Sequence, residues 1–599
     1  MCLFASGDNL IEIIFFNSNR YSVLEDLGDQ SMKRRRRTWT AKDVRNLKKL
    51  AAKKTRAANI ARALRRAEGA TATHAKIEDN HMINEDLTPA TSARVLRSMA
   101  LRTQTAGTDA FAMAPAEVDN GDEARYADKS GTYTKGLLQT GVGLVDLAAY
   151  QTFKDALRSG NPADFQNITI GGSRTQNGPQ GGLAFYLGCL DSSQFSVPPA
   201  PALASEAYAT ELVELYWASL LRDVAFTDYS ANPIATQAAA ELSSMPAYVG
   251  PRNASNQVTP ELLFRGDFQG EKLGPYLSQF LLKPTAYGSL PIVQKYITNK
   301  KNTDFMLDPA EFQRVQNGIP TGKSLTPGSA LYLHDGRGLA AYTHEDVLFE
   351  AYFIAFLVIN TLKVPLNPGN PYIGSRTQNG FATMGGPDIA ATIAAMAGEA
   401  IRSVWYQKWW VHLRHRPESG GAIVHLIKSG QGGSIQGQVS NTVLNSQAVQ
   451  KSFTANNSYL LSQAFPEGSP THPAYPTGHG AVGGACITIL KFFFDGNYKL
   501  PTSELVMPTP DGMNTVPYVP PPGEPPLTVN GELNKLASNI SFGHGIHAGI
   551  HWRSDTDTSM QLGEAVALSY LRDRAKTYNE KFSVSLTKLE GTTETISNL

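Results

Sequence analysis

The chain has 599 residues, more than one ordinary core organises, so its length predicts two or more domains or one large helical domain with additions. Its net charge of +1 and its 42% of hydrophobic residues suit a globular chain with a sizeable core. Its three cysteines are far apart with no Cys-x-x-Cys pair, which argues against a thiolate metal site, a c-type haem and a disulfide framework.

Residues 1 to 32 show no clear pattern and are expected to be an N-terminal extension. The stretch LIEIIFF within them is short, contains Glu12 and lacks a basic start and a cleavage site, so it predicts no secretory signal. The longest apolar stretch, Val347 to Leu362, contains Glu350 and Asn360 and is shorter than the roughly 18 residues of a membrane span. We expect a buried helix there and no membrane segment or membrane partner. The compartment, cytoplasmic or reached by export, stays unknown.

Residues 33 to 77 form a strongly basic segment. Fifteen Lys or Arg lie between residues 33 and 66, against the single acid Asp43. Val44, Leu47 and Leu50 follow helical spacing, and Thr40 is placed to cap that helix. The pattern predicts a helix-turn-helix-like module that could contact nucleic acid, or else a solvated basic arm with a nascent helix. Residues 78 to 135 are polar and acidic, as expected of a linker.

Residues 136 to 599 are expected to be the main domain. Apolar side chains recur there at helical spacing and long alternating strand patterns are scarce, so a mostly α fold is predicted. The expected helices are Ser205 to Leu221, Val347 to Leu362, Ile389 to Val411, Ala481 to Phe494 and Gln561 to Arg574. The heptapeptide GSRTQNG occurs twice, at 172–178 and 374–380, but its flanks do not match and its residues suit any turn.

Eight of the twelve histidines lie between His412 and His551, which is the strongest chemical signal in the sequence. The first stretch in this region is WYQKWWVHLRHRPE, where Lys408 and Arg416 are eight residues apart and Pro417 is expected to end the helix. Such a pair can bring a point charge and a forked donor to one tetrahedral oxyanion. The alternative is a helix that faces solvent, although the neighbouring tryptophans favour partial burial.

The second stretch is SPTHPAYPTGHGA. Thr477 and Gly478 would lie at the start of a helix from about Gly480 to Phe494, where free N–H groups and the helix dipole favour an anion. His479 is then placed to exchange protons beside that anion. A proline-rich turn with histidines that face water is the alternative.

The third stretch is GHGIHAGIHWRSD, in which His551 and Asp555 are four residues apart. On a helix they would share one face. A carboxylate beside a liganding imidazole often fixes its tautomer, although an ordinary surface pair has the same spacing.

With these three stretches in this order, the sequence resembles the vanadium-dependent haloperoxidases, in particular the bromoperoxidases of marine algae. Longer segments carry the likeness too, including FPEGSPTHPAYPTGHGAVGGACITILKFFFD and LTVNGELNKLASNISFGHGIHAGIHWRSD, and it covers about residues 130 to 599. The resemblance implies a mostly helical fold of two bundles, in the architecture shared with acid phosphatases. It also implies a vanadate cofactor, hydrogen peroxide and a halide as substrates, a small organic acceptor for the hypohalous acid equivalent, and a homo-oligomer.

The resemblance also implies roles for individual residues. His551 would bind vanadium through one covalent bond and would be oriented by Asp555, while His479 would be the acid-base residue. The vanadate oxygens would be held by Lys408, Arg416, Thr477 and Gly478. Neutralising the oxyanion is the catalytic contribution expected of Lys408 and Arg416.

The sequence departs from the family at two positions around the vanadate. Thr477 stands where the family usually has serine, and its hydroxyl preserves the expected role. Gly545 stands where the family has an arginine, six residues before the vanadium-binding histidine, so one guanidinium fork is missing. His544, reached through a one-residue insertion, or His547 would have to replace it, with a protonated imidazole as the donor.

The residues expected near the halide give conflicting signals. Trp405 lies three residues before Lys408, where algal bromoperoxidases commonly have arginine and fungal chloroperoxidases have tryptophan. His472 is instead a bromoperoxidase feature. Because bromide is easier to oxidise than chloride, we expect bromide oxidation, with chloride as a further substrate.

Two other functions fit parts of the sequence. A phosphatase of the related acid phosphatase superfamily would use His551 as nucleophile and His479 as acid. Alternatively, the basic module would define a nucleic-acid-associated protein whose large domain is inactive because the arginine is missing.

Overall fold

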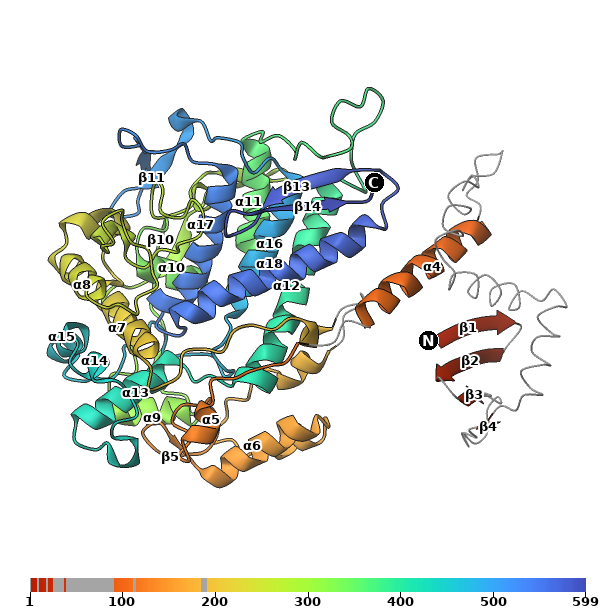
Figure 1. Cartoon of the computed structure of the whole chain (residues 1–599). Coiled ribbons are helices and arrows are strands. Elements are labelled where there is room, and N and C mark those ends of the chain that lie inside the picture. Colours follow the sequence, from red (N-terminus) through yellow and green to blue (C-terminus); the bar gives the residue numbers. More distant parts are fainter. Residues whose placement is uncertain are drawn as a thin grey trace. The chain divides into compact units, whose positions relative to one another are not determined.

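The computed structural model describes residues 2–7, 10–17, 20–24, 37–38, 91–110, 115–184 and 191–599. The chain divides into two compact units, Met1–Phe111 and Ala112–Leu599. Figure 1 shows the elements of both units in sequence colours.

The first unit contains a four-stranded antiparallel sheet in the order β1-β2-β3-β4. Its elements are β1 (Cys2–Gly7), β2 (Leu10–Asn17), β3 (Arg20–Leu24), β4 (Arg37–Thr38) and the helix α4 (Thr91–Ala110). Sequence analysis predicts no element in residues 1 to 32, whereas LIEIIFF forms most of β2, as its Ile and Phe residues favour. The basic module at 33–77 lies outside the described residues except for β4, so nucleic-acid binding there stays a prediction.

The second unit begins earlier than the predicted boundary at residue 136. Residues of the expected linker contribute buried polar contacts to it. The Asp122 carboxylate accepts a hydrogen bond from the Leu203 backbone N–H at 2.8 Å, and Lys135 forms a buried ion pair with Glu418 at 2.6 Å. Because buried charges need such partners, this part of the chain is integral to the fold. A polar composition did not distinguish it from a linker.

The second unit is mostly helical, and its strands are short. Its α-helices are α5 (Asp122–Arg125), α6 (Leu147–Ser159), α7 (Glu206–Leu221), α8 (Pro233–Ser243), α9 (Pro309–Gln316), α10 (Gly336–Tyr342), α11 (Glu350–Thr361), α12 (Gly386–Tyr406), α13 (Pro417–Lys428), α14 (Asn441–Leu444), α15 (Gln447–Asn456), α16 (Gly478–Phe493), α17 (Val529–Phe542) and α18 (Arg553–Ala575). Two π-helical turns, η7 (Gln407–His412) and η10 (Gly543–His547), extend α12 and α17. The five helices expected in the main domain are confirmed as α7, α11, α12, α16 and α18.

The strands of this unit form two-stranded antiparallel pairs. They are β5 (Gln139–Gly141) with β6 (Leu144–Val145), β7 (Thr285–Tyr287) with β8 (Leu290–Ile292), β9 (Tyr296–Asn299) with β10 (Pro327–Leu331), β11 (Val506–Pro508) with β12 (Thr515–Pro517), and β13 (Ser583–Thr587) with β14 (Thr593–Ser597). None of the described helices is long and apolar enough to cross a membrane.

The helices pack in two groups around one continuous core. In the first group, α16 is buried along its whole length and packs against α12, α17 and α18 (Figure 1). A Cβ on Gly484 would lie 1.9 Å from the Met560 carbonyl oxygen, and one on Gly563 would lie 1.9 Å from that of Ala481. Glycine at both positions therefore permits the close approach of α16 and α18. In the second group, α8, α13, α14 and α15 surround α7.

Candidate active site

Lys408 and Arg416 do not lie on one helix, which corrects the expectation from the sequence. Lys408 lies in the π-turn η7, the chain reverses at Leu413 with φ +45°, and Arg416 is the N-cap of α13. Pro417 is the first residue of α13, a position that suits proline because no intrahelical N–H is required there. Two turns, rather than one helix, therefore direct both cations to the same place.

Both cations are fully buried and both hold the segment that precedes α16. Lys408 Nζ donates to the carbonyl oxygens of Pro473 and Ala474 at 2.8 and 2.7 Å. Arg416 donates from Nε to the His472 carbonyl oxygen at 2.9 Å. Neither cation forms a salt bridge with any residue in the described ranges. Burial and the charge of Arg416 hold the pKa of Lys408 well below its usual value, and burial lowers the pKa of Arg416 to about 10.

The N-terminus of α16 completes this group of donors. Thr477 is the N-cap, yet its side chain forms no cap hydrogen bond, and its buried Oγ1 has no partner among the described residues. Its backbone N–H donates to the Asp555 carbonyl oxygen at 3.0 Å, which ties the start of α16 to α18. The first N–H groups of a helix carry the positive end of its dipole, so Gly478 begins a segment that favours an anion. We call Lys408, Arg416, Thr477 and Gly478 the oxyanion cradle.

His551 is the first of four buried side chains joined by hydrogen bonds. Its Nδ1 lies 2.9 Å from Asp555 Oδ2, Asp555 Oδ1 accepts from Arg414 Nη1 at 2.7 Å, and Arg414 Nη2 donates to Glu211 at 2.9 Å. All four side chains are buried, and we call them the carboxylate relay. His551 lies before α18 rather than on it, which corrects the expected shared helix face. Asp555 is the third residue of α18 and also accepts from the Trp552 N–H at 3.1 Å.

This relay determines which nitrogen of His551 can bind a metal. A carboxylate paired with arginine only accepts hydrogen bonds, so Nδ1 carries the proton and Nε2 carries the lone pair. Arg416 Nη1 lies 2.8 Å from Nε2, so the cradle and the relay meet at this atom. Burial, together with Arg416 and Lys408, holds the pKa of His551 well below its usual value and keeps the ring neutral, as ligation requires.

His479 lies in the first turn of α16 beside two partners. Its Nε2 is 2.9 Å from Asp346 Oδ1, and its ring stacks on that of His544 with 3.8 Å between centroids. The carboxylate contact places the proton of the neutral ring on Nε2 and leaves the lone pair on Nδ1. An imidazole with a defined tautomer beside an oxyanion can take up and return protons.

His472 and Trp405 lie together at the edge of the cradle. Their ring centroids are 4.8 Å apart, and the His472 ring is within 3.0 Å of Arg416 Nη2. Trp405 Nε1 donates to the Asn177 carbonyl oxygen at 3.1 Å. Asn177 belongs to the first GSRTQNG copy, so this heptapeptide supports the wall of the site. The second copy, at 374–380, lies in a largely exposed loop.

Four of the eight clustered histidines lie elsewhere. His415 bonds the Tyr208 hydroxyl at 3.0 Å and stacks on Trp552, while His412 bonds the Gln407 side chain. His425 lies on α13 away from the cradle. His547 contacts the Tyr276 hydroxyl at 2.9 Å within an aromatic cluster, and burial lowers its pKa to about 3. The expectation that His547 could replace the missing arginine is therefore wrong, because its ring is neutral and used in packing.

Three residues of the site were not found by sequence reasoning. Arg414 and Glu211 anchor Asp555 and so orient His551, and Asp346 contacts His479. Arg414 lies two residues before Arg416, and its spacing to Asp555 or Glu211 gives no local signal. Asp346 precedes His479 by 133 residues, and no spacing rule connects them.

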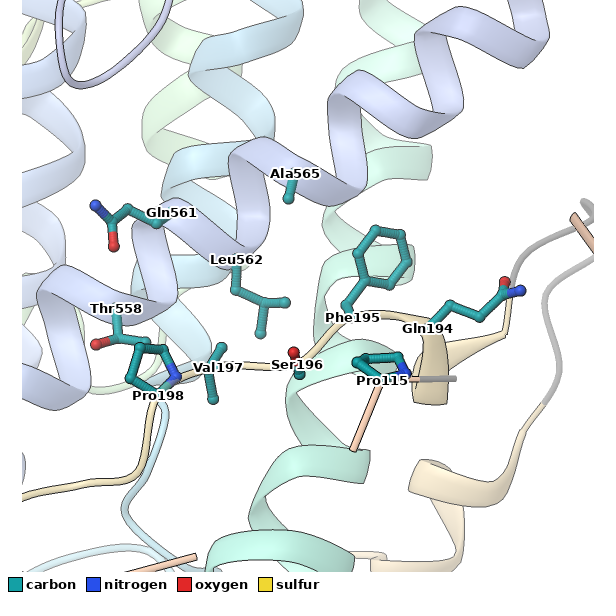
Figure 2. Close-up of a pocket in the computed structure, with 10 residues that line it drawn as sticks. All are labelled: Pro115, Gln194, Phe195, Ser196, Val197, Pro198, Thr558, Gln561, Leu562 and Ala565. Atoms are coloured by element: carbon teal, nitrogen blue, oxygen red, sulfur yellow. The ribbon is translucent and has the colours of Figure 1, made fainter. Parts of the chain in front are cut away.

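A separate cavity of about 450 Å³ lies between residues 194–198 and α18. Figure 2 shows Phe195, Val197 and Leu562 around it, with Gln561 and Thr558 along one side. None of the described residues that line it is an acid, a base or a histidine. This cavity therefore offers no side chain for acid-base chemistry.

The cradle and the relay suit one tetrahedral oxyanion. Two buried cations and a helix start supply positive charge, and the Thr477 hydroxyl supplies a further donor. The hydrogen-bond partners of the cations are carbonyl oxygens and histidine rings, which carry no negative charge, and His551 offers a lone pair. The fold and these donors thus fit a class of mostly helical proteins suited to hold a tetrahedral oxyanion. In agreement, the family model described as "VCPO second helical-bundle domain" matches residues 389–580.

Similarity to known proteins identifies the family within this class. A vanadium-dependent bromoperoxidase from Corallina officinalis is 31% identical over 558 residues, which cover 79% of this chain and 92% of that protein. One from Ascophyllum nodosum is 31% identical over 491 residues, which cover 78% and 85%. The homohexameric structure of the second vanadate-dependent bromoperoxidase from Ascophyllum nodosum matches with a TM-score of 0.80 and 27% identity, over 84% of this chain and 90% of that one. The chain belongs to the vanadium-dependent bromoperoxidase family.

Proposed function

We propose that this chain is a vanadate-dependent haloperoxidase. It would use hydrogen peroxide to oxidise a halide to a hypohalous acid equivalent, which halogenates small organic acceptors. The observation that carries the proposal is the oxyanion cradle, whose two buried cations are not neutralised by a carboxylate contact from any described residue. The relatives named vanadium-dependent bromoperoxidases supply the identity of the anion.

The residues present fit vanadate. His551 would ligate vanadium through Nε2. The oxygens would be held by Lys408, Arg416, Thr477 and the backbone N–H of Gly478. Bound vanadate would supply Lewis acidity that activates peroxide without a change in oxidation state. Lys408 and Arg416 would stabilise the negative charge that develops on the oxygens, and burial strengthens that effect by excluding water.

Proton transfer is assigned to His479. Its Nδ1 lone pair would accept a proton from hydrogen peroxide, and Asp346 at Nε2 would stabilise the imidazolium that forms. The proton then returns when the hypohalous acid equivalent leaves. This order requires His479 to be neutral when peroxide arrives.

The halide is assigned to the side of the pocket formed by His472 and Trp405. Burial and the charge of Arg416 hold the pKa of His472 well below its usual value, so its ring is neutral and does not bind a halide by charge. We expect bromide to be oxidised more efficiently than chloride. Turnover of iodide without bromide would contradict this assignment.

The homohexameric structure of the relative from Ascophyllum nodosum supports an oligomeric state for this chain. We infer that this chain also forms a homo-oligomer. Light scattering that gives a monomeric mass would contradict it.

The function is tested by reconstitution. The protein is freed of vanadium, loaded with vanadate, and assayed for bromination of a phenol dye with bromide and peroxide. We expect activity that depends on all three components, bound vanadium by elemental analysis, and loss of both in His551→Ala. Phosphate-ester hydrolysis by the vanadate-free protein without any bromination after loading would instead identify a phosphatase.

A further inference from the structure

The two copies of the heptapeptide GSRTQNG have different surroundings. The second copy, at 374–380, lies in a largely exposed loop, and among the described residues its side chains form hydrogen bonds only within that loop. The first copy, at 172–178, is bonded to the core. Gln176 accepts from the buried Tyr133 hydroxyl at 2.8 Å and donates to the Lys135 carbonyl oxygen at 3.0 Å. The same seven residues therefore form an exposed loop in one place and a docked segment in the other.

The docked copy holds the residue that precedes His472. The Thr471 side chain is fully buried, and its hydroxyl oxygen lies 2.6 Å from the Thr175 carbonyl oxygen and 2.8 Å from Asn177 Oδ1. The Asn177 backbone N–H donates to the Thr471 carbonyl oxygen at 2.8 Å. Thr471 is thus held through its side chain and its backbone, and this restrains the position of His472, the next residue.

Asn177 also holds the second residue on the halide side of the pocket. Its carbonyl oxygen accepts from Trp405 Nε1 at 3.1 Å. Trp405 lies on α12, whereas His472 lies in the segment before α16, and their ring centroids are 4.8 Å apart. The N–H, the side-chain oxygen and the carbonyl oxygen of one residue therefore link the two chain segments that carry these rings.

We propose that the first GSRTQNG copy positions the halide side of the pocket, with Asn177 and Thr471 as its positioning residues. Asn177 acts directly on Trp405, and it acts on His472 through Thr471. Among the described residues, neither Asn177 nor Thr471 forms a hydrogen bond with a member of the oxyanion cradle. Their loss should therefore weaken halide binding and leave the oxyanion in place. This inference rests on the proposed function, which assigns the halide to Trp405 and His472.

Two substitutions test this role in the vanadate-loaded full chain. Thr471→Val removes the buried hydroxyl and keeps the shape of the side chain. Asn177→Ala removes the Oδ1 acceptor at an exposed position, so the fold is not at risk. Steady-state bromination measures the KM for bromide and the KM for peroxide separately. We expect the bromide KM to rise about fivefold in Thr471→Val and roughly threefold in Asn177→Ala, with kcat and the peroxide KM unchanged.

The chain supplies a matched control for each substitution. Asn379→Ala makes the same change at the equivalent position of the exposed second copy and should leave both KM values unaltered. Thr471→Ser keeps the hydroxyl and should retain the wild-type KM for bromide.

A second measurement does not depend on turnover. Crystals of the vanadate-loaded protein are soaked in bromide without peroxide, and diffraction is measured at the bromine absorption edge. We expect an anomalous peak beside Trp405 and His472 in wild type and in Asn379→Ala. In Thr471→Val we expect a weaker peak and a displaced His472 ring.

The outcomes separate this inference from the proposed function. A lower kcat with a rise in both KM values would indicate a general structural role, and an unchanged bromide KM in both variants would show that the heptapeptide does not act on the halide. Either result overturns the proposal, as would equal effects of Asn177→Ala and Asn379→Ala. If loaded wild type does not brominate at all, the proposed function fails, together with the halide assignment on which this inference rests.

Discussion

The carboxylate relay and the oxyanion cradle are both buried and both charged, yet their charges are balanced differently. In the relay, Arg414 lies between Asp555 and Glu211, and each carboxylate accepts a hydrogen bond from it. In the cradle, Lys408 and Arg416 donate to carbonyl oxygens, which carry no net charge. Because an uncompensated buried cation costs free energy, the relay is complete by itself while the cradle gains from an anion.

This difference in charge balance predicts different roles for the relay and the cradle. The relay fixes the tautomer and direction of His551 and should act as a rigid support. The cradle should respond to its occupant, since Arg416 Nη1 now lies against the lone pair of His551 Nε2. Substitutions in the relay and in the cradle should therefore differ in the type of effect as well as in its size.

The largest expected effect is that of Arg416→Met. The change removes a buried fork that contacts both His472 and His551, and we expect kcat for bromination to fall about 10²–10³-fold. Steady-state bromination after vanadate loading measures it. Arg402→Met, a partly exposed arginine paired with Glu399, is the matched control and should retain activity. Comparable losses in both variants would contradict a specific role for the cradle.

The same contrast between balanced and unbalanced charge can be tested away from the site. Glu418 contacts Lys135, and its pKa lies below the usual value although burial alone would raise it. No cation among the described residues forms a salt bridge with Glu271, and burial raises its pKa to about 7. Between about pH 4.5 and 7 the Glu271 carboxyl is ionised in the unfolded chain but protonated in the folded chain. The free energy of unfolding therefore falls as the pH rises through this window.

Glu271→Gln mimics the protonated acid. We expect the free energy of unfolding to exceed that of wild type by up to about 3 kcal/mol above pH 7, and to be unchanged near pH 4.5. Urea unfolding at several pH values measures the difference. If the difference in the free energy of unfolding between the variant and wild type is the same at all pH values, the titration of Glu271 does not cause it.

Asp555→Asn tests the role of the carboxylate relay. The change interrupts the chain between His551 and Arg414, and we expect vanadate affinity to fall roughly 10–100-fold. Calorimetry of vanadate binding measures the loss. If affinity stays at the wild-type value, Asp555 does not orient His551.

The smallest effect is expected at Thr477. Thr477→Val removes the buried hydroxyl but keeps the shape, and should weaken oxyanion binding by about 1 kcal/mol, or roughly fivefold. Thr477→Ser keeps the hydroxyl and should stay within about twofold. A valine variant that binds as tightly as the serine variant would remove Thr477 from the cradle.

The comparison also shows what the sequence could predict. Long periodic segments such as α7 and α16 were predicted because their apolar spacing is a local signal. Pro417 was expected to end a helix but begins α13. The local signal is ambiguous, because proline is common both after the end of a helix and in its first turn. The position of Thr477 and Gly478 at the start of α16 was also predicted, from the Thr-Gly-His step.

The relay could not be predicted beyond its first pair. Arg414, in the turn before α13, links Asp555 of α18 to Glu211 of α7, and nothing in the spacing of these residues indicates it. Likewise, eight clustered histidines have similar surroundings in the sequence, and tertiary packing separates His544 from His547. The π-turn that rotates His544 into the pocket has no clear sequence signature.

The central claim is that one oxyanion joins the cradle to the relay at His551. Crystals soaked in vanadate, with diffraction measured at the vanadium absorption edge, test it most directly. The account predicts a single anomalous peak within bonding distance of His551 Nε2 and in contact with Lys408, Arg416 and Thr477, which is absent from His551→Ala crystals. A peak at another place, or one that persists unchanged in the variant, would contradict it.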